Sequence, residues 1–158
     1  MKKIIVIIGL IILTGCSVEK INTVGNYKEG TYTGTAIDNY GGSSNTATAV
    51  VNVNSSGVIT SVYLDTTYTK DGIVTTKKAL GYDYNMKGVS ASIGKIEGGA
   101  EWFEQVVTLE KKIVEEQGTS WLKWSDSEST KTDSVAGVTI KIDALYEALT
   151  NALEQAKK

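Results

Sequence analysis

Alternating apolar and polar residues in the first half of the chain predict an antiparallel sheet. One predicted strand places four small apolar residues on one face: Ala47, Ala49, Val51 and Val53. After a turn at residues 54–57, a second strand does the same with Val58, Thr60, Val62 and Leu64. An earlier segment, 27–42, alternates Tyr, Thr and Gly. Together these segments predict a three-stranded meander.

Two later segments repeat apolar residues at helical spacing. The first, residues 100–118, has a face made of Trp102, Val106, Leu109 and Ile113, and Gly118 is its expected stop. The second, residues 142–157, repeats Ile142, Leu145, Leu149 and Leu153, with Asp143 as the expected N-cap. Residues 70–99 show neither period and predict an ordered connecting loop. The order predicts one small α+β domain, an antiparallel β-meander sheet with helices packed on one side.

The N-terminal residues predict export and a lipid anchor. Lys2 and Lys3 precede an apolar run, residues 4–13, that is typical of a signal peptide. The run ends in Leu-Thr-Gly-Cys16, which resembles the lipobox of bacterial lipoproteins. We therefore expect a signal peptide at 1–15, a tether at 16–26 with lipidated Cys16, and a domain at 27–158. The chain would then sit on the extracellular face of the cell membrane.

Two alternatives remain for this N-terminal segment. Cys16 can instead be an ordinary thiol that follows a secretory signal. The precursor can also have an additional role, because the piece that ends at Gly15 can be released as a short hydrophobic signalling peptide.

Composition excludes several classes of chemistry. The chain of 158 residues has no histidine and one cysteine, which excludes Ser–His and Cys–His catalysis, CxxCH haem attachment and most zinc or copper sites. No metal ligand set or nucleophile–base pair is visible, so a carrier is favoured over a substrate-converting enzyme. The net charge is −2, and loss of Lys2 and Lys3 would make it more negative. We therefore expect no binding to nucleic acid.

The stretch Asp133-Ser-Val-Ala-Gly-Val-Thr139 is the main candidate for chemistry. It joins small residues, a carboxylate and a hydroxyl directly before the last predicted helix. One interpretation is an Asx-type turn and a helix start. The other is a phosphate site, because backbone N–H groups and the positive end of a helix favour an anion. In that case the Thr139 hydroxyl can be esterified by the phosphate.

The same stretch resembles the D-x-x-[ST]-G-A-T signature of FMN-binding domains, in which the Thr carries FMN through a phosphoester made by a dedicated flavin transferase. Asp133, Gly137 and Thr139 match, whereas Ala136 replaces the usual Ser or Thr and Val138 replaces Ala. "GYDYNMK", "SASIGK" and "EWFEQ" follow one another as in surface lipoproteins of Gram-positive bacteria that contain this domain. The resemblance extends from about residue 27 to the C-terminus.

The resemblance implies covalent FMN at Thr139, with Asp133, Ala136, Gly137 and Val138 around the phosphate. It also implies that six residues lie near the flavin: Tyr84, Met86, Lys87, Gly94, Lys95 and Trp102. Trp102 fits a core position on its helical face equally well, and lysines are more often solvated surface residues.

By the same resemblance, the protein is an extracellular electron carrier. It would take electrons from a membrane quinone-linked dehydrogenase and pass them to free flavins, ferric iron or other extracellular acceptors. The alternative is a lipoprotein without flavin that binds a small ligand or a surface partner. Ala136 and Val138 favour this second hypothesis, because they depart from the signature.

Overall fold

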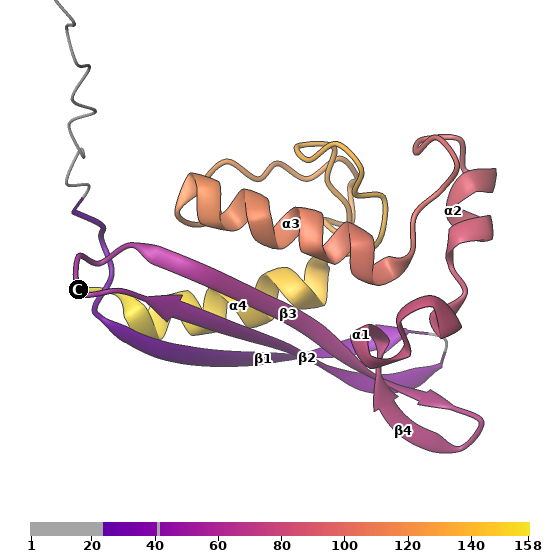
Figure 1. Ribbon diagram of the computed structural model, residues 1–158, viewed down its shortest axis with the longest axis horizontal. Coiled ribbons are helices and arrows are strands. Elements are labelled where there is room, and N and C mark those ends of the chain that lie inside the picture. The colour runs from indigo at the N-terminus through magenta and orange to yellow at the C-terminus, as the bar shows by residue number, and fades with distance from the viewer. Residues whose placement is uncertain (1–23, 41) are drawn as a thin grey trace, which may run out of the picture.

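The computed structural model describes residues 24–40 and 42–158. The predicted signal peptide, lipidated Cys16 and signalling peptide lie outside these residues. The described chain begins beside its own C-terminus, where Lys28 donates its N–H to Ala156 O at 2.7 Å (Figure 1). Gly25, within the predicted tether, already donates its N–H to Ser56 O. No helix in the described part of the chain is long and apolar enough to cross a membrane.

The fold is α+β, as predicted, with an open antiparallel sheet of strand order β1-β2-β3-β4. The strands are β1 (Gly30–Tyr40), β2 (Ser43–Val53), β3 (Ile59–Lys70) and β4 (Ile73–Thr76). Three short helices follow: α1 (Lys77–Leu80), the 3₁₀ helix η1 (Gly81–Tyr84) and α2 (Lys87–Ser92). The two long helices are α3 (Trp102–Glu116) and α4 (Asp143–Ala156).

The strands follow the alternation in the sequence, with one shift. Ala47, Ala49, Val51 and Val53 of β2 are all buried. In β3 the predicted face was wrong at its start, because Thr60 is exposed and Ile59 is buried instead. A register shift between Asn52 and Val53 causes the change, since it adds one unpaired residue to β3.

The predicted long loop at residues 70–99 is more structured than expected. Strand β4 pairs with the end of β3 and makes the sheet four-stranded, and α1, η1 and α2 follow directly. These elements are too short for a hydrophobic period to develop, so the pattern of the sequence did not indicate them. They form the right-hand end of the molecule in Figure 1.

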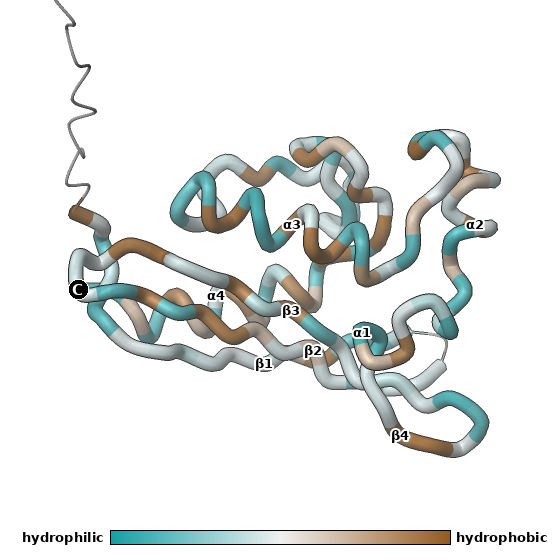
Figure 2. Tube along the Cα trace, viewed as in Figure 1, coloured by the Kyte–Doolittle hydropathy of each residue, from teal (hydrophilic) through white to brown (hydrophobic). Residues whose placement is uncertain are grey.

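Both long helices pack on the sheet, α4 against β1 and β2 and α3 along β3. In Figure 2 hydrophobic and hydrophilic positions are interleaved along both, as expected for amphipathic helices. Asp143 is the first residue of α4 and not its N-cap, which is Ile142. The edges of the sheet are covered by side chains: Asn151 of α4 donates to Thr35 O of β1, and Glu110 of α3 accepts the Leu64 N–H of β3.

Candidate functional site

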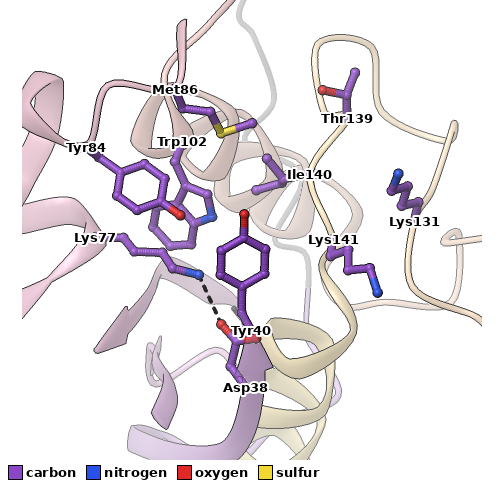
Figure 3. A pocket seen from close by; sticks show the side chains of 10 residues that line it. All are labelled: Asp38, Tyr40, Lys77, Tyr84, Met86, Trp102, Lys131, Thr139, Ile140 and Lys141. Carbon is purple, nitrogen blue, oxygen red and sulfur yellow. Dashed lines mark hydrogen bonds and ion pairs between the residues drawn. The ribbon is translucent and has the colours of Figure 1, made fainter. Parts of the chain in front are cut away.

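A cleft of about 260 Å³ opens where β1 ends, next to the first residues of α1 and α3 and to the segment before α4 (Figure 3). Residues far apart in the sequence therefore meet at one place. Its lining is aromatic on one side and rich in lysine on the other: Asp38, Tyr40, Lys77, Tyr84, Met86, Trp102, Lys131, Thr139, Ile140 and Lys141.

Aromatic rings form one wall of the cleft. Tyr84 and Trp102 lie with ring centroids 6.5 Å apart, and Tyr84 is also edge-on to Tyr68 at 5.2 Å. Trp102 is 4% exposed and belongs to the core, as one of its two interpretations expects, and it also lines the cleft. Burial, and to a lesser extent Tyr40, Tyr68 and Asp38, raise the pKa of Tyr84. Its hydroxyl therefore stays protonated at neutral pH and remains a hydrogen-bond donor.

Glu101 fixes the loop that carries Met86 to the start of α3. This buried carboxylate accepts the Met86 N–H at 2.8 Å and the Lys87 N–H at 3.2 Å. Charge-assisted hydrogen bonds of this kind are among the stronger ones in proteins. Met86 is thereby held next to Trp102, the first residue of the helix that follows Glu101.

Lys77 is a buried cation at the cleft. Its Nζ lies 3.0 Å from Asp38 Oδ2, as the dashed line in Figure 3 marks. The same Nζ lies 5.2 Å from the ring centroids of both Tyr40 and Trp102. The carboxylate and the ring faces stabilise an ammonium that would otherwise be costly to bury. Lys77 is neither among the residues predicted around the phosphate nor among those predicted near the flavin.

Thr139 lies half-buried at the cleft and is oriented by Gln105 of α3. Gln105 Oε1 accepts both the Thr139 N–H, at 2.8 Å, and the Thr139 hydroxyl, at 3.2 Å. Gln105 is fully buried, and its Nε2 donates to Ala100 O at 3.3 Å. The side-chain amide of Gln105 therefore fixes the orientation of the Thr139 hydroxyl at the edge of the cleft.

The preceding turn differs from a simple phosphate loop. Ala136 and Gly137 are exposed, Val138 is buried, and Gly137 has φ +83°, a left-handed conformation that favours glycine. The N–H groups of Val138 and Thr139 already donate to Val135 O and to Gln105. Positive charge for an anion beside Thr139 therefore comes mainly from lysine side chains.

Three lysines line the two concavities to which Thr139 belongs. Lys131 and Lys141 line the cleft, and Lys95 lines a neighbouring hollow of about 70 Å³ that also includes Asp133 and Thr139. Lys95 and Asp133 form an exposed ion pair at 3.3 Å. Thr139 thus lines both concavities, and at least one lysine lines each of them.

The segment that carries Lys131 is fixed by Asp126. Its carboxylate accepts hydrogen bonds from the N–H and the hydroxyl of Thr130, and these bonds hold the pKa of Asp126 below its usual value.

The predicted site residues are brought together in part. Four of them line the cleft: Tyr84, Met86, Trp102 and Thr139. Lys95 and Asp133 line the adjoining hollow. Lys87 and Gly94 are exposed and line neither of the two, and Ala136 and Gly137 form the exposed turn beside Thr139.

Several residues of the site were missed by sequence reasoning. They are Asp38, Tyr40, Lys77, Gln105, Lys131, Ile140 and Lys141. Each is a single residue without a motif around it, and their contacts join segments distant in sequence. The "EWFEQ" stretch did contain Gln105, although nothing in it indicated a contact with Thr139. Among the described residues no group of three or more His, Cys, Asp or Glu side chains could hold a metal ion.

Replacing Gln105 with leucine is expected to lower the free energy of unfolding by roughly 1–3 kcal/mol, because the Thr139 N–H would lose its partner next to the core. Chemical denaturation measures this change. Gln155→Leu is the control, since that side chain is exposed on α4 and donates to Thr33 O. Equal losses in the two variants would show that Gln105 has no special role in holding Thr139.

Comparisons with known proteins identify a related structure, whose description names no function. Neither a scan against protein-family models nor a search of curated proteins finds a match. A solution NMR structure of a Clostridium thermocellum protein, from the Northeast Structural Genomics Consortium, is similar at a TM-score of 0.53 and 30% sequence identity. The match covers 83% of this chain and 93% of that one. The chain therefore belongs to the same family as this clostridial protein.

Proposed function

We propose that the protein is a lipid-anchored extracellular electron carrier with FMN attached to Thr139 by a phosphoester. The observation that carries this proposal is the position of the Thr139 hydroxyl, which lies at a cleft that has aromatic rings on one side and lysines on the other. A flavin phosphate requires these two environments next to each other.

The side chains fit the two parts of FMN. Lys131, Lys141 and Lys95 provide charge for a phosphate on Thr139. Flat and polarisable surfaces suit a ring system, and Tyr84, Trp102 and Met86 supply them on the opposite side. Gln105 would keep the Thr139 oxygen directed towards the cleft during attachment.

The cleft is small for a cofactor site. Its volume of about 260 Å³ is below the roughly 300–1,000 Å³ of typical ligand pockets. A ring held here would remain partly in solvent, and contacts alone would bind it weakly. A covalent bond removes the need for a deep pocket and leaves the ring accessible to partners. When bound, FMN supplies the electron transfer, and the protein supplies position and electrostatics.

The arrangement of the ends suits an anchored carrier. The described chain begins beside the C-terminus of α4, at the end of the sheet opposite to α1 and β4 (Figure 1). The described chain therefore begins at the end remote from the cleft, which suits an anchor that precedes it. We propose that the donor is a membrane quinone-linked dehydrogenase and that free flavins, ferric iron or other extracellular compounds are acceptors.

The decisive experiment is co-expression of the exported protein with a flavin transferase. We expect a mass increase equal to one FMN phosphoester, mapped to the Thr139 peptide, and yellow absorbance that survives denaturation. An unmodified mass in the presence of active transferase would contradict the proposal.

The alternative is a binding module that holds a small planar anion without a covalent bond. The exposed Ala136, which offers no hydroxyl beside Thr139, favours it. Under this alternative the protein would stay colourless after co-expression, yet a ligand would protect it against thermal unfolding.

A further inference from the structure

We propose that Lys77 and Asp38 set the reduction potential of the ring in the cleft, Lys77 by raising it and Asp38 by lowering it. This inference rests on the proposed function. It assigns a tuning role to two residues that lie outside the Thr139 segment and belong to α1 and β1.

The first argument is burial. The Lys77 side chain is 6% exposed and that of Asp38 is 19% exposed, yet both line the cleft. Charges removed from water act more strongly on a neighbouring group, because the surrounding dielectric is lower. Lys131 and Lys141 line the same cleft but are exposed, so solvent and salt screen them.

The second argument is rigidity. The Lys77 ammonium is held by Asp38 at 3.0 Å and lies near three rings, at 5.2 Å from Tyr40 and Trp102 and 6.0 Å from Tyr84. Two of these rings, Tyr84 and Trp102, form the proposed contact surface for the flavin. The charge is thus fixed beside the place where the ring would lie.

The direction of each effect follows from the charge that reduction adds. Reduction transfers two electrons to the ring from the quinone-linked donor, which becomes oxidised. The electrons add negative charge to the ring, and protons taken up from water cancel part of it. A fixed ammonium stabilises this form more than the oxidised form and so raises the potential. The Asp38 carboxylate does the opposite, and the observed potential reflects the difference between the two.

Three variants of the mature, flavin-loaded protein test this inference: Lys77→Met, Asp38→Asn and the double variant. Spectroelectrochemical titration gives the midpoint potential of each. We expect a shift to lower potential for Lys77→Met, a shift to higher potential for Asp38→Asn, and a value between the two for the double variant. Lys141→Met, which removes an exposed cation from the same cleft, should shift the potential less than Lys77→Met.

The signs distinguish tuning from a structural role. If the substitutions only loosened the cleft, the midpoint potentials of both single variants would shift in the same direction. Such a result, or unchanged potentials in both, would overturn the inference. If Lys77→Met does not fold by circular dichroism, the Asp38→Asn shift and its reversal in the double variant decide the question. Flavin attached with unshifted potentials refutes only the tuning role, whereas a wild-type protein without flavin refutes the proposed function as well.

Discussion

The Thr139→Val protein is expected to carry no covalent flavin after co-expression with a flavin transferase, whereas Thr139→Ser keeps it. Valine has nearly the shape of threonine but no oxygen to esterify. The bond from the Thr139 backbone N–H to Gln105 Oε1, at 2.8 Å, does not involve the Thr139 side chain and should remain, while the 3.2 Å hydroxyl bond is lost. The stability loss should therefore be only about 1 kcal/mol. Absorbance of the denatured protein and its intact mass measure the attachment.

A matched control separates attachment from general damage. Thr60 is exposed on β3, away from the cleft, and its hydroxyl donates to Asn52 O at 3.2 Å. Thr60→Val loses a comparable hydrogen bond and should retain full flavin loading. If Thr139→Val remained yellow after denaturation, another residue would carry the cofactor and the assignment of Thr139 would be wrong.

The architecture could be predicted largely because the fold is dominated by long amphipathic elements. Ala47, Ala49 and Val51 showed the inner face of β2 directly, and Trp102 and Ile113 marked α3. The start of β3 could not be predicted in the same way, because a single inserted residue reverses which side chains face inward. Strand β4 and helix α1 have four residues each, too few to show a period.

The site was predictable only where residues lie close together in sequence. Thr139 was selected as part of a short motif, and Tyr84, Met86 and Trp102 came from a family resemblance. Lys77 meets Asp38 across 39 positions and Gln105 meets Thr139 across 34, so no local pattern joins them. Such pairs are created by the packing of α1 and α3 against the ends of other elements.

The second large effect is expected from Gly34→Ala, which should lower the free energy of unfolding by at least about 3 kcal/mol, the upper end of the usual cost of overpacking. Gly34 lies in β1 under α4, and a Cβ there would be 2.1 Å from Ala148 O and 2.5 Å from Ala152 N. Both obstacles are helix backbone, so no side chain can rotate away. In an ordinary strand the same change would instead stabilise the protein, because glycine costs conformational entropy.

Gly88→Ala is the matched control, because a Cβ at this position in α2 would meet nothing within 4 Å. We expect it to leave stability unchanged or to raise it by about 0.4–1 kcal/mol, as measured by chemical denaturation. The two variants also test whether the packing of α4 on β1 maintains the cleft. Strand β1 carries Asp38 and Tyr40 and α4 follows Thr139, so displacement of α4 from β1 would move two sides of the cleft apart. Flavin loading should therefore fall in Gly34→Ala and not in Gly88→Ala. Equal stability of the two would show that α4 can move away from β1 at little cost.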